Sequence, residues 1–169
     1  MTNIDLRAVP VILTIRGTQN FDGTDGESTE LITEGFLTAL DDGLSLTYDE
    51  SALTGMEGTT TTFHVNGSQV VLTRSGKVHS QMVFQEGRQH TSLYETPFGA
   101  LTVDIQTSRL RHNLTERGGV LEIRYSIAVQ HNVTGQNLFK IRVRAKNERA
   151  APLTRGANTH QDREGEQPI

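Results

Sequence analysis

The residues best suited to bind something lie in one polar stretch, GMEGTTTTFHVNGSQVVLTRSG (residues 55–76). It contains a glutamate, four consecutive threonines and an arginine. A carboxylate, hydroxyl groups and a guanidinium together supply both donors and acceptors of hydrogen bonds. If strands bring these side chains to the inside of a fold, they form the polar wall of a cavity for a polar or anionic small molecule.

A hairpin within this stretch decides which side chains share a face. Asn66-Gly67 is a strong hairpin signal, because both residues tolerate the positive φ angles of a type I′ turn. A two-residue loop at this dipeptide predicts that Thr59 lies opposite Arg74. The apolar Phe63 must face the core, and residues of the same parity in the strand then face inward with it. The threonine run is therefore predicted to be a strand, since β-branched residues suit a pleated sheet.

The predicted inward face defines five candidate ligand-binding residues: Tyr48, Glu57, Thr59, Thr61 and Arg74. An arginine on an inner face needs a counter-charge or access to water. Glu57 has the parity of Thr59 and could supply that charge, provided that the chain does not bend at the intervening glycine. Two interpretations follow: a structural ion pair at a barrel mouth, or a site that binds an anionic or polar ligand.

A second hairpin is predicted in SQMVFQEGRQHTSLYE (residues 80–95), with its turn at Glu86-Gly87. A two-residue loop there predicts that three alternate residues of the first strand face inward, as do the three residues opposite them on the second strand. The first row comprises Ser80, Met82 and Phe84, and the facing row comprises Leu93, Thr91 and Gln89. The two hairpins together place His64 and His90 on outer faces.

No arrangement of residues in the chain predicts catalysis. A metal site needs three or four converging ligands, but the six histidines are scattered, and they are His64, His79, His90, His112, His131 and His160. The sequence has no G-x-S-x-G element and no glycine-rich loop leading into a helix. Three carboxylates, Glu50, Glu57 and Glu95, could act as general acids or bases only if they were buried together. We therefore expect no enzyme, no metal and no cofactor.

Charge is unevenly distributed along the chain. Residues 1–99 carry a net charge of −8, whereas residues 100–149 carry +5. Lys140, Arg142, Arg144 and Lys146 alternate along one predicted strand, and Arg124 extends this row from a neighbouring strand. Such a row suits either a solvated strand or an RNA-binding face. The nearby aromatic residues, Phe139 and Tyr125, share the apolar parity, which makes RNA binding less favoured than binding of a small ligand or of a partner protein.

Apolar and polar residues alternate through most of the chain, which predicts strands and no helix. Glycine, asparagine and aspartate turns separate the segments, as in an antiparallel meander, and FDGTDGEST (residues 21–29) predicts a flexible loop. A long meander removes its exposed edges by closing into a barrel or by splitting into a sandwich. We predict an all-β fold with one domain over residues 1–149. It is a single antiparallel lipocalin-like (calycin) β-barrel of about 8–10 strands.

The composition limits the other possibilities. The chain of 169 residues has no cysteine, so it has no disulfide or thiol chemistry. It shows neither an apolar run of transmembrane length nor a signal peptide, and we expect a cytoplasmic protein without a membrane partner. Residues 150–169 lose the alternating pattern and are rich in polar residues, which predicts a disordered tail.

The central block resembles a bacterial family, the YwiB-like proteins or domain of unknown function 1934. The resemblance rests on YDES, TGMEGTTTT, RSG, SQMVF and YETPFG in this order, followed by GG-LEI-Y and NLFKIRV. These elements extend over roughly residues 9–147. The resemblance implies a calycin-like, lipocalin-type barrel and no activity, since the family offers no functional residues that could be assigned here.

The sequence therefore favours a non-enzymatic barrel that binds a small ligand. The alternative is a protein–protein interaction module that acts through the outer barrel surface. A ligand-binding protein should contain a cavity around Arg74, whereas an interaction module should have a filled barrel and an exposed apolar patch.

The tail gives the first test. Deletion of residues 150–169 should leave the thermal midpoint within about 1 °C of the full chain, because a disordered segment removes little apolar area on folding. Differential scanning calorimetry of both proteins measures this difference. A large drop in the midpoint would show that the tail docks on the barrel.

Overall fold

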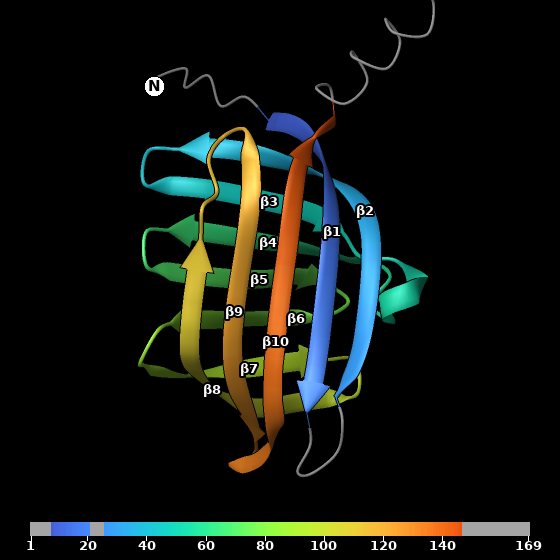
Figure 1. Cartoon of the computed structure of the whole chain (residues 1–169). Coiled ribbons are helices and arrows are strands. Elements are labelled where there is room, and N and C mark those ends of the chain that lie inside the picture. Colours follow the sequence, from blue (N-terminus) through green and yellow to red (C-terminus); the bar gives the residue numbers. More distant parts are fainter. Residues whose placement is uncertain (1–7, 21–25, 147–169) are drawn as a thin grey trace, which may run out of the picture.

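Ten strands and one short 3-10 helix make up the protein in a computed structural model that describes residues 8–20 and 26–146 (Figure 1). The elements in chain order are β1 (Ala8–Asn20), β2 (Glu27–Leu40), β3 (Gly43–Asp49), η1 (Ala52–Thr54), β4 (Thr59–Asn66), β5 (Gln69–Gly76), β6 (His79–Gln85), β7 (Gln89–Thr96), β8 (Gly99–His112), β9 (Gly118–Val129) and β10 (Asn132–Ala145).

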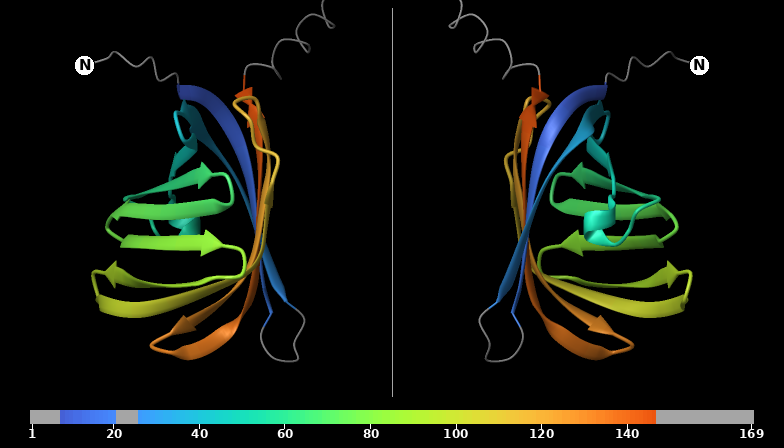
Figure 2. Two further views of the ribbon diagram at one scale, coloured as in Figure 1. Left: turned by 90° about the vertical axis from the view of Figure 1, so that its left-hand side faces the viewer. Right: turned by 90° about the vertical axis from the view of Figure 1, so that its right-hand side faces the viewer.

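The strands form one closed antiparallel barrel in which each strand pairs with its neighbours in sequence. The last strand closes the ring by pairing with the first, from Val11 opposite Ala145 to Asn20 opposite Gln136. The long strands β8, β9, β10, β1 and β2 form one side of the barrel, and the shorter strands β3–β7 cross behind them (Figures 1 and 2). The prediction of a single all-β barrel is confirmed.

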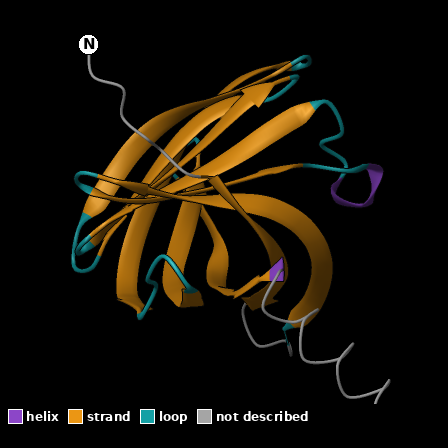
Figure 3. Ribbon diagram, turned by 90° about the horizontal axis from the view of Figure 1, so that it is seen from above, coloured by secondary structure: helices purple, strands orange, loops and turns teal. Residues whose placement is uncertain are grey.

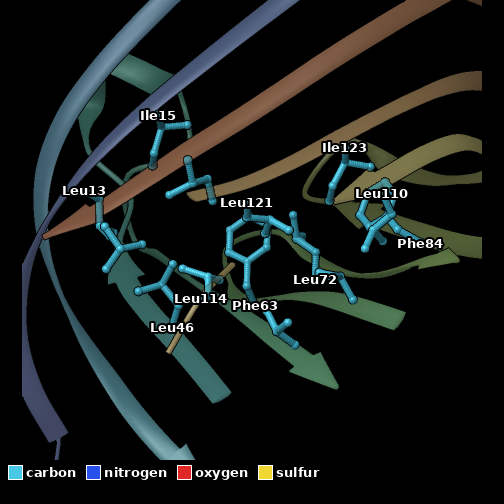
Figure 4. Close-up of a cluster of buried hydrophobic side chains, with 14 of the residues drawn as sticks. Leu13, Ile15, Leu46, Phe63, Leu72, Phe84, Leu110, Leu114, Leu121 and Ile123 are labelled. Atoms are coloured by element: carbon cyan, nitrogen blue, oxygen red, sulfur yellow. The ribbon is translucent and has the colours of Figure 1, made fainter. Parts of the chain in front are cut away.

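The core fills the space between these two sides, as the close-up in Figure 4 shows. Alternate residues of the strands point inward, and the predicted apolar rows are buried in most strands. The fully buried residues include Leu13, Leu46, Phe63, Ile105 and Leu121. The alternating pattern therefore assigned the inner face of these strands correctly.

The first predicted turn lies one residue further along the chain. Asn66 pairs with Gln69, so the two loop residues are Gly67 and Ser68. Gly67 has a φ of 57°, while Asn66 keeps an ordinary negative φ. Glycine at the first loop position is typical of a type II′ turn. Thr61 rather than Thr59 consequently lies opposite Arg74.

The faces of this hairpin are nevertheless as predicted. The register differs from the predicted one by two residues, and a shift of two leaves every side chain on its own side of the sheet. Thr59, Thr61 and Phe63 are buried. The threonine run is a strand, as the sequence indicates.

The second predicted hairpin is wrong in its second strand. Its loop contains three residues, Glu86–Arg88, and Ser80 lies opposite Tyr94 instead of Leu93. The extra residue turns β7 over, because side chains alternate between the faces of a strand. Leu93, predicted inside, is 53% exposed, and Thr91 and Gln89 are exposed with it. The first row, Ser80, Met82 and Phe84, is buried as predicted.

His90 changes side with β7. It lies opposite the buried Ile105 and has a buried Nε2 atom, so it faces inward, whereas the prediction placed it outside. Backbone hydrogen bonds hold the loop in its three-residue form. The Gly87 amide donates to Thr107 O at 2.9 Å, and the Thr107 amide donates to Arg88 O at 3.2 Å. Thr107 itself begins a bulge in β8, which no sequence pattern indicates.

Several predictions fall on residues that the structure does not describe. They include the predicted tail at residues 150–169, the boundary between domain and tail after residue 149, and residues 21–25 of the predicted loop. The rest of that loop differs from the prediction, because Glu27–Thr29 belong to β2 and pair with β1. In the described part of the chain, no helix is long and apolar enough to cross a membrane.

Substitution of one buried and one exposed phenylalanine tests which side chains stabilise the fold. Phe63 is fully buried and stacks on Tyr48 and Phe139, with ring centroids 6.5 and 5.5 Å away. Phe63→Ala should lower the free energy of unfolding by about 3–5 kcal/mol. Phe98, which is 97% exposed, is the matched control, and Phe98→Ala should change the free energy by less than about 0.5 kcal/mol. Urea denaturation measures both, and equal losses would contradict the assigned core.

Candidate functional site

A row of polar side chains crosses the inner face of five neighbouring strands. Each residue lies directly opposite the next across the sheet, and the row is Tyr48 (β3), Thr61 (β4), Arg74 (β5), Ser80 (β6) and Tyr94 (β7). These positions have the parity of the core residues, so their side chains point into the barrel. The row therefore lies inside the barrel, where apolar residues would otherwise be expected.

Glu50, just beyond the end of β3, is the charge partner of Arg74. The Nε atom of Arg74 lies 3.9 Å from Oε2 of Glu50, and the two side chains are 15% and 1% exposed. The predicted partner, Glu57, is exposed and forms no ion pair among the described residues. Gly58 has a φ of 89°, and this bend breaks the strand alternation that would have carried Glu57 inward. The proposed Arg74–Glu57 pair is therefore wrong.

Two threonines fix the carboxylate of Glu50. Thr61 Oγ1 donates to Oε2 at 2.5 Å, and Thr54 Oγ1 donates to Oε1 at 2.9 Å. Thr54 comes from η1, a single helical turn that Figure 3 shows standing away from the strands. This turn begins where the Ser51 hydroxyl accepts from the Leu53 amide, and it ends at Gly55 in a left-handed conformation. The loop between β3 and β4 thus anchors the buried carboxylate.

This arrangement leaves part of the hydrogen-bonding capacity of the Arg74 guanidinium unused. At 3.9 Å its Nε atom is too far from Glu50 for a hydrogen bond, and the atom is buried without any hydrogen-bond partner. The Ser80 hydroxyl, directly opposite Arg74, is also buried without a partner. Unpaired polar atoms of this kind each cost on the order of 1–3 kcal/mol. A molecule that accepts hydrogen bonds at this place would remove part of that cost.

Two tyrosines contribute to the electrostatics of the site. Burial, followed by the negative charge of Glu50, raises the pKa of the Tyr48 hydroxyl well above its usual range. Burial also raises the pKa of Tyr125 on β9, and the positive charge of Arg74 opposes that shift. Both hydroxyls are therefore protonated at neutral pH and are available as neutral hydrogen-bonding groups.

A cavity of about 680 Å³ lies beside the Arg74–Glu50 pair. Its apolar wall is formed chiefly by Ile15, Leu31, Leu53, Met56 and Phe139. Its polar wall comprises Tyr48, Glu50, Thr54 and Arg74 together with Gln19, Thr29 and Glu30 from β1 and β2. It is found at the end of the barrel where β1 ends, β2 begins and the loop from β3 to β4 crosses. Its volume is in the range of pockets that hold small molecules, about 300–1,000 Å³.

The five candidate residues have different places in this arrangement. Tyr48 and Arg74 line the cavity. Thr61 lies beside them and binds Glu50, whereas Thr59 Oγ1 accepts from the Val78 amide at 3.3 Å and so has a structural contact. Glu57 lines a separate pocket on the other side of the same loop. The structure therefore brings together three of the five candidates and adds Glu50.

The carboxylates considered for catalysis are not gathered in this site. Glu50 is buried, whereas Glu57 and Glu95 are exposed. Within residues 8–20 and 26–146, no group of three or more histidines or carboxylates could hold a metal ion.

Sequence reasoning missed Glu50 as the partner of Arg74, although a signal was present. Leu44, Leu46 and Tyr48 alternate on the inner face, and Glu50 is the next residue with that parity. Tyr94 was missed because the loop before β7 has three residues instead of two. Tyr125 was predicted to face inward, but no sequence pattern indicates that the charge of Arg74 opposes the rise of its pKa.

Variants of the ion pair measure how strongly it is coupled. Arg74→Met leaves the Glu50 carboxylate buried without a cation, which should lower the free energy of unfolding by about 3 kcal/mol. Adding Glu50→Gln should restore part of that loss, because the unpaired charge is then absent. Chemical denaturation of the two single variants and the double variant gives the coupling energy. A coupling below about 0.5 kcal/mol, as found for exposed pairs, would contradict a buried pair.

Comparisons with known proteins agree with the fold described above. The chain is similar to the ywiB protein from Bacillus subtilis, known from a crystal structure, with a TM-score of 0.73 and 22% sequence identity. The similarity covers 83% of this chain and 94% of that one, and at this identity it concerns the fold alone. A search of curated proteins gives no match. The sequence profile of the family described as "Domain of unknown function (DUF1934)" matches residues 13–141, and the chain therefore belongs to this family.

Proposed function

We propose that the barrel binds a small amphipathic molecule in the cavity beside Arg74, without chemical conversion. The observation that carries the proposal is the buried Nε atom of Arg74, which has no hydrogen-bond partner next to a cavity of about 680 Å³. The Arg74 side chain is 15% exposed and lines the cavity, and a buried donor without a partner is costly in the protein alone. Its cost falls when a bound molecule accepts the hydrogen bond.

The walls of the cavity indicate the chemistry of the ligand. Glu50 already neutralises much of the charge of Arg74, and its own oxygens accept from two threonines. The ligand therefore needs an acceptor for Arg74, such as a carboxylate or a carbonyl group, rather than several negative charges. Its body should be apolar, because Ile15, Leu31 and Phe139 form the facing wall.

The same site gives no support for a catalytic mechanism. The oxygens of Glu50 accept hydrogen bonds from two threonine hydroxyls, and Arg74 lies 3.9 Å away, so the carboxylate is already engaged. The second carboxylate that lines the cavity, Glu30, is exposed and is paired with Arg16 at 2.7 Å, and the described lining residues include no cysteine or histidine that would form a nucleophile–base pair. We therefore propose binding rather than turnover, as the sequence also indicates.

The alternative function, a protein–protein interaction module, has one observation in its favour. Leu53 on η1 and Phe98 between β7 and β8 are 85% and 97% exposed. A partner protein could cover them. This alternative predicts no role for Arg74 in binding, so the same variants separate the two functions.

Thermal shift with matched compounds tests ligand binding. We would use straight-chain carboxylic acids of six to twelve carbons, with the corresponding alcohols and trimethylammonium salts as controls. At a hundredfold excess over Kd, a bound acid should raise the melting temperature by about 5–10 °C. The acids should stabilise more than the alcohols, and the cationic compounds should have no effect.

Variants of Arg74 then test whether the acids stabilise the protein by binding in the cavity. Arg74→Met should abolish stabilisation by the acids, and Arg74→Lys should weaken it, because lysine keeps the charge but lacks the Nε donor. Arg88→Met, at an exposed position in the loop between β6 and β7, should behave as the wild type. If no acid or other acceptor compound stabilises the wild type, or if Arg74→Met retains full stabilisation, the proposal is wrong.

A further inference from the structure

The outer surface of the barrel carries a basic groove that is separate from the cavity. It follows β1 and β10, which run side by side at the front of Figure 1. A hollow of about 310 Å³ is lined there by Thr14, Arg16, Glu30, Lys140, Arg142 and Arg144. We call this surface, with its extension to Ile32 and Phe36 on β2, the β1–β10 face.

The charges of this face are unbalanced within the described part of the chain. Glu30 is paired with Arg16 at 2.7 Å, and Glu34 is paired with Lys146 at 3.0 Å. Glu122, opposite Lys140, is paired with Arg124 at 3.7 Å. The nearby carboxylates are thus already occupied. No described carboxylate forms an ion pair with the remaining three cations, Lys140, Arg142 and Arg144.

These three unpaired cations are evenly spaced. They occupy alternate positions of one strand, so neighbouring side chains are separated by about 6.8 Å. An extended chain with one negative charge per repeat, such as the backbone of a single-stranded nucleic acid, can place successive phosphates beside successive cations. Arginine also binds phosphate through two parallel hydrogen bonds, and two of the three cations are arginines.

Two apolar side chains on β2, separated by Glu34, could hold bases beside the cations. Ile32 and Phe36 on β2 point outward and are 65% and 52% exposed. Ile32 lies opposite Thr14 on β1, and Thr14 lies opposite Arg142 on β10. Ile32 is therefore two strand spacings, about 10 Å, from Arg142. Phe36 lies further along β2, two residues beyond Glu34, which is level with Arg144. Phe36 supplies the exposed aromatic ring that the inward-facing Phe139 and Tyr125 do not.

We propose that the β1–β10 face binds single-stranded nucleic acid without sequence preference. Lys140, Arg142 and Arg144 contact consecutive phosphates, and Phe36 and Ile32 contact bases on the β2 side. An aromatic ring stacks on any base, and phosphate contacts carry no sequence information, so the mode of binding is independent of sequence. The proposal does not depend on the function of the cavity, because outward and inward residues of β1 and β10 alternate.

Fluorescence anisotropy with a labelled 12-nucleotide RNA and a DNA of the same sequence tests this inference. Three phosphate contacts predict a slope of about −2 for log K against log salt, which is about a 20-fold loss of affinity between 50 and 200 mM salt. The triple variant Lys140→Gln, Arg142→Gln, Arg144→Gln should bind at least tenfold more weakly and lose most of the salt dependence. Phe36→Ala should weaken binding about fivefold or more.

The matched control removes three charges elsewhere. Lys77→Gln, Arg88→Gln, Arg117→Gln changes the net charge equally at exposed positions outside the β1–β10 face, and it should bind as the wild type. Circular dichroism melts of both triple variants check that the barrel is intact. Polyglutamate and phosphatidylserine vesicles serve as competitors that should displace the RNA only weakly.

Several results would overturn the proposal. They are the absence of RNA or DNA binding at 50 mM salt, equal losses in the two triple variants, and displacement by polyglutamate or vesicles at the same charge concentration as by unlabelled RNA. The last result would assign the face to an acidic protein or an anionic membrane. None of these results bears on the stabilisation of the barrel by acids, so the two proposals fail separately.

Discussion

The pairing of β1 with β10 is the constraint on which the rest of the structure depends. It joins the first and last strands over ten residue pairs, from Val11 with Ala145 to Asn20 with Gln136. Without this ladder, both terminal strands would expose unpaired backbone groups, and the inner face of the sheet would be open to water. Closure gives every strand an inner and an outer side. It also places Phe139 of β10 against Phe63 of β4, although the two are distant in sequence.

Closure also explains why a charged pair can persist inside the barrel. Apolar side chains such as Leu13, Phe63 and Leu121 fill the middle, whereas Arg74 and Glu50 lie near the end of the barrel beside a cavity. A pair in the middle would lose its hydration entirely, and its mutual attraction rarely compensates for that loss. At the end of the barrel, two threonine hydroxyls replace water around Glu50. Fewer polar groups replace water around Arg74, since its Nε atom has no hydrogen-bond partner among the described residues. For this reason we place Arg74 at the centre of the site.

The fold and part of the site could be predicted from the sequence, because side-chain alternation is a local property. Tyr48, Thr61 and Arg74 were placed inward from parity alone, and the turn at Gly67 tolerated an error because the register moved by two residues. An error in the turn before β7 had a larger effect on the prediction. A single extra loop residue places Leu93 outside and Tyr94 inside. Glycine signals mark where a loop lies but do not fix its length. Here that length depends on hydrogen bonds to the bulge in β8, a contact between strands that no local pattern contains.

The partner of Arg74 shows a second limit of local reasoning. Parity pointed to Glu57, but the bend at Gly58 turns that residue outward, and Glu50, which was not considered as a partner, takes its place. The same alternation that guided the prediction also separates the two surfaces for which we propose functions. On β1, Ile15 lines the cavity and its neighbour Arg16 lines the basic groove; on β10, Phe139 and Lys140 do the same. Because adjacent residues face opposite sides, the cations of β10 can be substituted while the side chains of β1 and β10 that line the cavity remain in place; Glu30 on β2 lines both surfaces.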